Sequence, residues 1–352
     1  MRYLKTYRVF ESEPAAPTLT EDQIDWLNSC TAGSWKLNPT TRLIDVDGNF
    51  DCSSKSLTDL KGIKFGEVSG DFFCDDNQLT SLEGAPRIVG SSFYCRNNLL
   101  TSLEGAPQTV RIFYCYNNQL TSLVGAPQTV VRDFSCNNNL LTSLVGAPQS
   151  VGSDFSCENN RLTSLEGAPQ SVGWNFSCEN NRLTSLKGAP QSVGWHFNCS
   201  NNQLTDLKGA PQTVDVGFNC NNNQLTSLDG APQSVEGSFY CHNNLLTSLE
   251  GAPQTVDGSF DCENNQLTSL EGAPQSVGRS FSCHENPVSE ETLASIFTLM
   301  KTRSYQQALE EHWPKMGNDD RALMYKQMPN LPPEEVRKYQ ALATVSRIKG
   351  YL

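Results

Sequence analysis

The chain has 352 residues, and its 38 acidic and 26 basic side chains leave a formal net charge of −12 at pH 7. An acidic protein repels phosphate backbones, so this balance argues against a nucleic-acid partner. No apolar run approaches the length that spans a bilayer and no secretory signal is visible, so the sequence predicts a cytoplasmic protein without a membrane partner.

Residues 1–16 are expected to form a flexible leader. The segment MRYLKTYRVFESE mixes basic and aromatic residues and precedes a stretch of Pro and Ala. It is similar to the short leaders, with Lys-Thr-Tyr followed by Phe and Glu, that direct internal proteins into the heads of some large tailed phages. This resemblance implies cleavage after Glu11 or Glu13 and a location in the host cytoplasm or the virion. A plain flexible terminus is the simpler interpretation.

Residues 17–45 are expected to cap one end of the region that follows. Thr20 and Gln23 form a capping-box pattern before an apolar helical pattern, which predicts a short helix. A Trp and the strand-like stretch RLIDVDGNF complete the cap. The segment DVDGNFD has Gly at its fourth place, whereas a calcium-binding loop needs it at the sixth, so we do not interpret it as a calcium site.

Residues 46–286 consist of repeats of one short sequence motif. The triplet Gly-Ala-Pro occurs ten times between Gly84 and Gly272, with a step of 21 residues except for one step of 20. The pattern Phe-x-Cys occurs twelve times between Phe50 and Phe281. A fixed period of this length indicates a repeat architecture, and we expect about twelve turns.

Within one period the repeat frame reads Val-x-x-x-Phe-x-Cys-x-x-Asn-x-Leu-x-x-Leu-x-Gly-Ala-Pro. This frame resembles the leucine-rich repeat, with Phe and Cys in place of two strand leucines, and its short period is most similar to bacterial and phage members. The resemblance implies a mainly β solenoid with a parallel sheet on its concave face. It implies nothing specific about activity.

The residues that recur in every turn are of types that build and border a hydrophobic core. Phe and Cys alternate with variable residues, so both point to one side of a short strand, and one turn alone buries too little to be stable. The Asn three places after Cys occurs in eleven of the twelve turns, with Lys55 as the exception. An inward amide can bond backbone groups of its own turn and its neighbours. We therefore expect an asparagine ladder beside the core.

Twelve of the thirteen cysteines occupy one frame position, from Cys52 to Cys283. When turns stack in register, the Cβ vectors run parallel instead of converging. This disfavours disulfides and favours thiols that pack as small apolar groups in a reducing compartment. No Cys-x-x-Cys pair or His-Cys cluster suggests a metal site, and we expect no cofactor. Cys30 lies outside this column and is expected to be inert.

The repeat does not continue into residues 287–352, and this segment is expected to be helical. Ser289 precedes an amphipathic pattern, and further helix starts follow, the last at Pro332. A helical cap on the open end of the solenoid is the simplest interpretation, and a small partner-binding module is the alternative.

Residues that vary between turns flank Phe and Cys and are expected to line the concave face. Tyr and Arg gather over consecutive turns, and further along two Trp share one frame position. Such residues dominate binding hot spots, although side chains that merely shield neighbouring strands would show the same pattern. Carboxylates between the two groups favour a protein partner with a basic strip. The predicted partner-binding residues are Phe73, Tyr94, Arg96, Arg111, Tyr114, Tyr116, Arg132, Asp154, Glu158, Trp174, Glu179, Trp195 and His196.

The sequence therefore predicts a non-enzymatic protein-binding scaffold. No Cys follows Cys283, which removes the cysteine-dependent ubiquitin ligase chemistry that follows similar repeats in some bacterial effectors. His242 and His284 share a frame position two turns apart, about 10 Å, which is too far for one metal or a direct relay. A virion-packaged or assembly-associated structural protein is the first alternative, and an enzyme housed in residues 288–352 is the second.

Overall fold

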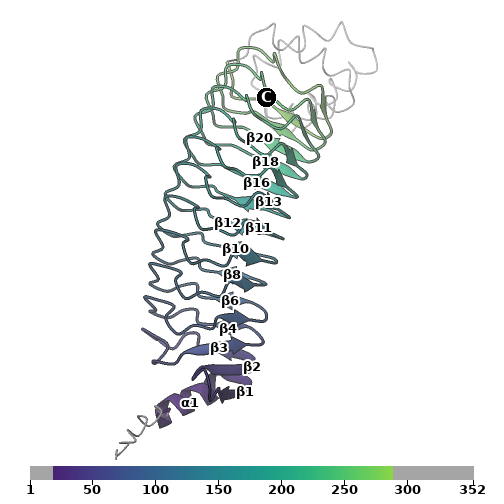
Figure 1. Cartoon of the computed structure of the whole chain (residues 1–352). Helices are drawn as coiled ribbons and strands as arrows, with labels where there is room; N and C mark the ends of the chain where they lie inside the picture. The colour runs from purple at the N-terminus through teal and green to yellow at the C-terminus, as the bar shows by residue number, and fades with distance from the viewer. Residues whose placement is uncertain (1–18, 288–352) are drawn as a thin grey trace, which may run out of the picture.

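The computed structural model describes residues 19–287, which form one elongated coil of stacked turns (Figure 1). The leader expected over 1–16 and the helices expected after Pro287 lie outside these residues. Within the described range, no helix is long and apolar enough to cross a membrane. In Figure 1 the strand arrows follow one side of the coil, and irregular loops close each turn on the other side.

A short helix covers the N-terminal end of the coil. Helix α1 (Glu21–Cys30) begins at the expected capping box. The Gln23 N–H donates to Thr20 Oγ1 at 3.2 Å, and the Thr20 N–H donates to Gln23 Oε1 at 3.0 Å. The buried Trp26 ring of this helix meets the Phe50 ring edge-on, with centroids 5.3 Å apart. The helix thereby shields the first Phe of the array from water.

Strand β2 (Ile44–Asp51) starts two columns of short strands. On one side it pairs antiparallel with β1 (Thr31–Leu37). On the other side its first half pairs with β3 (Phe65–Val68) and its second half with β4 (Phe72–Phe73), both parallel. Because β1 holds β2 extended over eight residues, the first expected turn is a hairpin strand instead of a regular turn. The described coil therefore has about eleven regular turns, not twelve.

Eleven parallel strands of two or three residues form the first column, and Phe lies opposite Phe in each pair. We call this row the Phe column. Its members are β4, β6 (Phe93–Tyr94), β8 (Phe113–Tyr114), β10 (Phe134–Ser135), β12 (Phe155–Ser156), β14 (Phe176–Ser177), β16 (His196–Asn198), β18 (Gly217–Asn219), β20 (Ser238–Tyr240), β22 (Phe260–Asp261) and β24 (Phe281–Ser282).

A second column follows the Val of each turn. The pairing along this column is interrupted between β5 and β7 and again between β17 and β19. After β3 its members are β5 (Ile88–Val89), β7 (Thr109–Val110), β9 (Thr129–Val130), β11 (Ser150–Val151), β13 (Ser171–Val172), β15 (Ser192–Val193), β17 (Thr213–Val214), β19 (Ser234–Val235), β21 (Thr255–Val256) and β23 (Ser276–Val277).

Stacking places the Phe rings in one continuous row through the core. From Phe72 to Phe281, neighbouring rings stack with centroids 5.2–5.7 Å apart. Leu and Val side chains of every turn are buried around them. Burial of one Phe contributes roughly 1.5–3 kcal/mol. A single turn could not provide it, because each ring inside the row is covered by the rings of the two adjacent turns.

The cysteine side chains form the inward column that the repeat frame predicts. The twelve cysteines from Cys30 to Cys262 are buried and form no disulfide. In several turns the thiol donates to a carbonyl of the next turn, as from Cys157 Sγ to the Ser177 oxygen at 3.3 Å. Burial raises the pKa of the Cys157 thiol, which keeps it in the protonated, unreactive form.

The repeat asparagine joins two turns, as the sequence predicts. Asn160 Nδ2 lies 3.1 Å from the carbonyl oxygen of Cys157 in its own turn and 3.1 Å from that of Cys136 in the preceding turn. Its Oδ1 accepts a hydrogen bond of 3.0 Å from the Leu141 N–H. The same pattern recurs at the other ten repeat asparagines. These buried backbone groups would otherwise lack partners.

The Gly of Gly-Ala-Pro is required by backbone conformation and by space. Gly167 has a φ of +93°, in the region that favours glycine. A Cβ atom there would lie 2.5 Å from the backbone nitrogen of Val145 in the preceding turn. Any other residue would therefore push adjacent turns apart.

Replacing Asn160 with Ala should lower the free energy of unfolding by about 3 kcal/mol, because three buried backbone groups lose their partner. Chemical denaturation followed by circular dichroism measures the change. Asn159→Gly is the matched control: Asn159 is exposed with a φ of +55°, which Gly adopts without steric cost, so its effect should stay below about 1 kcal/mol. Equal losses in the two variants would contradict the ladder.

The native protein should react with a maleimide at no more than one cysteine within minutes, because twelve thiols are buried and only Cys283 is half-buried. Intact-mass spectrometry before and after denaturation counts the labels, and unfolding should expose all thirteen thiols. Rapid labelling of Cys157 or Cys178 in the folded protein would show that the column does not point inward.

Candidate functional site

The variable side chains beside Phe and Cys form one continuous outer surface. Because successive residues of a strand point to opposite faces, the inward Phe and Cys leave the residue after each of them pointing outward. The residue before Phe lies at the margin of the same surface. We call this surface the strand face. It follows the strand arrows along the whole coil in Figure 1.

Four aromatic side chains gather on the strand face at β4, β6 and β8. Phe73 stacks on Tyr94 with ring centroids 4.8 Å apart, and Tyr94 meets Tyr114 edge-on at 5.4 Å. Tyr116 lies 5.9 Å from Tyr114. The structure thus brings together these four residues that the sequence singled out, and we call them the aromatic patch.

Arg96 links the aromatic patch to a buried carboxylate. Its Nε lies 3.4 Å from Asp75 Oδ2, and its Nη1 donates to the Tyr116 hydroxyl at 2.6 Å. Burial raises the pKa of the Asp75 carboxyl to about 6, although the Arg96 charge opposes that rise. Sequence reasoning missed Asp75. Its frame position directly after Cys, shared with Arg96 and Tyr116, could have revealed it.

Asp154 lies in a polar ladder at the margin of the strand face. Its Oδ1 accepts hydrogen bonds from the Asn175 backbone N–H at 3.0 Å and from Asn175 Nδ2 at 2.8 Å. In the same way, Asp133 Oδ1 accepts a hydrogen bond of 3.3 Å from the Asp154 N–H. Asn175 Oδ1 accepts one of 3.3 Å from the His196 N–H. These side chains therefore hold successive turns together, a role that the sequence analysis did not foresee.

Glu158 and Glu179 lie half-buried on successive strands of the strand face. Each has one carboxylate oxygen, Oε2, that is buried without a hydrogen-bond partner among the described residues. Burial raises the pKa of Glu158 to about 7, and the neighbouring Glu179 charge raises it further. Burial also raises the pKa of Glu179. Negative charge is thus costly at this point of the surface.

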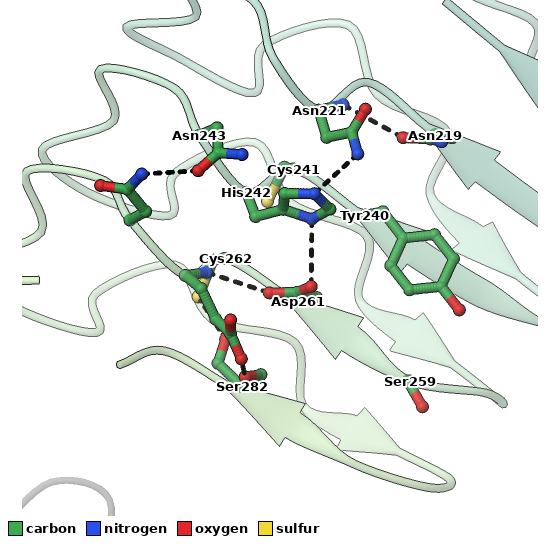
Figure 2. Close-up of polar contacts among 12 residues, drawn as sticks. Asn219, Asn221, Tyr240, Cys241, His242, Asn243, Ser259, Asp261, Cys262 and Ser282 are labelled. Carbon is green, nitrogen blue, oxygen red and sulfur yellow. Dashed lines mark hydrogen bonds and ion pairs between the residues drawn. The ribbon is translucent and has the colours of Figure 1, made fainter. Parts of the chain in front are cut away.

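A histidine bridges three turns near the C-terminal end of the described coil. Figure 2 shows the His242 ring between Asn221 and Asp261. Its Nδ1 lies 3.0 Å from Asp261 Oδ2, and its Nε2 lies 2.7 Å from Asn221 Nδ2. The hydrogen bond to Asp261 raises the pKa of His242. His284 contacts a different carboxylate, with its Nε2 2.7 Å from Glu263 Oε2, so the two histidines do not converge on one site. The described residues contain no group of three or more side chains placed to hold a metal ion.

The remaining predicted residues lie beside the strand face, where the Trp195 ring meets the His196 ring edge-on with centroids 6.5 Å apart. Arg111, Arg132, Trp174 and Trp195 stand two places before Phe, at the corner between the two columns of strands. Trp174 and Trp195 stack with centroids 5.2 Å apart, and both rings are exposed. The sequence placed these residues on the strands beside Phe. In the structure they stand in the bend between the Val strand and the Phe strand of each turn.

No protein-family model and no curated protein sequence matches the chain. Among solved structures, the leucine-rich repeat domain of APL1B matches 80% of this chain and 92% of its own, at 16% identity and a TM-score of 0.54. YopM from Yersinia enterocolitica WA-314 matches 78% and 70%, at 19% identity and a TM-score of 0.40. The functional domain of InlJ from Listeria monocytogenes, which includes a cysteine ladder, matches 67% and 53%, at 21% identity and a TM-score of 0.46. The likeness to the APL1B domain concerns the fold alone, and it agrees with the parallel turns of about 21 residues: the chain has the fold of a leucine-rich-repeat solenoid.

Replacing Glu158 with Gln should stabilise the protein at alkaline pH. The pKa of Glu158 in the folded protein is about 7, above its ordinary 4.5, so the stability it contributes is present at acid pH and is lost as the pH rises through 7. The variant should gain about 1–2 kcal/mol at pH 8 and clearly less at pH 5, after allowance for solvent around this half-buried group. Urea denaturation at both pH values measures the gain. The exposed Glu236→Gln should show no such pH dependence, and an equal gain in the two variants would refute the cause.

Proposed function

We propose that this protein is a non-enzymatic scaffold that binds a partner protein across the strand face, on the concave side of the coil. The observation that carries the proposal is the aromatic patch, a group of half-buried rings on a frame that does not need them. At the frame position of Tyr94 and Tyr114, later turns have Ser135, Ser156 and Ser177 without loss of the strand. The rings therefore contribute something other than the fold.

The aromatic patch has the physical properties of a binding hot spot. Tyr side chains bury a large area with few rotatable bonds, and they present a hydroxyl at the rim. Arg96 holds the Tyr116 hydroxyl in place, so little conformational entropy remains to be lost on binding. A partner would meet a surface that is already ordered.

The carboxylates further along favour a partner with basic side chains. Glu158 and Glu179 follow the aromatic patch on the same face, and the described residues supply neither with a salt bridge. A Lys or Arg of the partner would compensate charges that are half-buried and incompletely solvated. The partner is thus expected to present apolar side chains to the aromatic patch and a basic strip to the two glutamates.

The variant Tyr94→Ser/Tyr114→Ser should weaken partner binding at least tenfold, because it removes the centre of the aromatic patch. The partner is first isolated by crosslinking and affinity purification from the native source, and its Kd is then measured by biolayer interferometry. Tyr240→Ser is the matched control, since Tyr240 occupies the same frame position outside the aromatic patch. Circular dichroism verifies that both variants are folded. An unchanged Kd in the double variant, or an equal loss in the control, would defeat the proposal.

A further inference from the structure

A second surface runs along the corner between the two columns of strands. Backbone hydrogen bonds of 2.8–3.0 Å link its residues turn by turn: the N–H of Arg132 donates to Arg111, that of Ser153 to Arg132, that of Trp174 to Ser153, and that of Trp195 to Trp174. These five residues are therefore direct neighbours in space. We call them the corner column.

The fold does not need large side chains in the corner column. Other turns have Ser91, Gly237 or Gly258 at the same frame position. Yet Trp174 and Trp195 stand side by side with 43% and 47% of their surface exposed. Each ring covers one face of the other, because they stack at 5.2 Å with an interplanar angle of 13°. Two exposed Trp side chains in contact form an apolar surface, and such surfaces are typical of binding sites.

The two arginines of the corner column have no partner of their own. Arg111 is exposed and Arg132 is half-buried, and neither guanidinium makes a hydrogen bond or ion pair with another described residue. Adjacent like charges repel each other, and the chain as a whole carries a net charge of −12. An unpaired basic pair in an acidic protein is complementary to an anionic group from outside.

A groove of about 510 Å³ lies directly beside the corner column. Gly152, Gly173 and Gly194 form its floor, and the next residues in the chain are Ser153, Trp174 and Trp195. A Cβ atom on Gly173 would lie 2.0 Å from the Gly152 carbonyl oxygen, so close stacking of the turns requires bare backbone here. The groove is open to an extended chain because no side chain projects from its floor.

The groove has defined ends. At the frame position of the three glycines, the preceding turn has Val131, which is 59% exposed, and the following turn has Asp215. The polar wall consists of Ser150, Ser171 and Ser192. The serine hydroxyls and the bare glycine backbone offer polar groups to the backbone of an extended polypeptide, and Asp215 lines the groove at one end.

We propose that the corner column and this groove bind an extended, acidic segment of a partner protein. Carboxylates of the segment contact Arg111 and Arg132, an apolar side chain packs on the Trp174–Trp195 pair, and the backbone of the segment lies over the glycine floor. Arg132 and Trp174 are two turns apart, about 9.6 Å, which corresponds to about three residues of an extended chain. The segment therefore has an acidic pair followed, after a spacer of about two residues (one to three), by an apolar residue. The corner column borders the strand face, and this proposal does not depend on the function proposed for that face.

A single-stranded nucleic acid is the competing ligand for Arg and Trp side chains. Bases stack on open ring faces, but Trp174 and Trp195 cover one face of each other. The net charge of −12 also opposes a polyanion, whereas two carboxylates on a short segment add little repulsion. A peptide therefore fits this surface better.

The test uses fluorescein-labelled peptides and the full chain. Each peptide carries two glutamates, a Gly-Ser spacer of one to six residues, then phenylalanine and leucine. Fluorescence anisotropy at about 50 mM and about 200 mM salt should show binding that is tightest at spacers of about one to three residues and that weakens with salt. Peptides with lysines for glutamates, or with serines for the apolar pair, should bind at least tenfold more weakly. Failure of every spacer length to bind would overturn the proposal.

Variants of the chain identify the surface. Arg111→Glu/Arg132→Glu and Trp174→Ser/Trp195→Ser should each weaken peptide binding at least tenfold. Arg279→Glu is the matched control, because Arg279 has the same frame position and is exposed four turns beyond Trp195. Tyr94→Ser/Tyr114→Ser should leave peptide binding unchanged, which separates this surface from the strand face. An equal loss in Arg279→Glu, or binding of an oligo-deoxythymidine that the arginine and tryptophan variants abolish, would refute the assignment to an acidic peptide.

Discussion

The structure depends on the sharing of backbone partners between adjacent turns. Wherever the chain leaves the Phe column, its carbonyl and amide groups turn inward next to the core, where water cannot reach them. Asn160 resolves this by bonding Cys157 in its own turn and both Cys136 and Leu141 in the preceding one. A turn can satisfy its polar groups only if its neighbour is in register, so the ladder fixes the spacing of everything outside it.

That fixed spacing gives each frame position a constant place on the surface. Positions beside Phe and Cys point outward on the strand face, as with Tyr94 and Tyr114. The position two residues before Phe lies at the corner, as with Trp174 and Trp195. A residue change at either place alters the surface without altering the fold, because the core contacts involve other positions. This division explains how an almost invariant repeat presents two chemically different surfaces.

The two surfaces also differ in charge for a physical reason. Glu158 and Glu179 stand among the small side chains of the sheet and are half-buried, so their charge is poorly solvated. Arg111 and Arg132 stand at the bend; Arg111 is exposed there and Arg132 half-buried. Glu158 and Glu179 thus place carboxylates on the strand face. Arg111 and Arg132 place guanidinium groups along the corner beside it. The two arginines belong to the turns of Phe113 and Phe134, and the two glutamates to the turns that follow them.

The sequence by itself determined the period, the inward Phe, Cys and Leu, the asparagine ladder and the leucine-rich-repeat fold, because each of these follows from spacing that recurs in every turn. It also identified the members of the aromatic patch, since alternation along a strand sets their direction. Only the tertiary structure decided that the first copy is the hairpin strand β2, that Asp154 serves a polar ladder, and that Trp174 and Trp195 stand in the bend before the Phe strand. Those outcomes depend on where the chain bends and on which backbone groups the bend leaves without partners, and neither can be read from the order of residues within one turn.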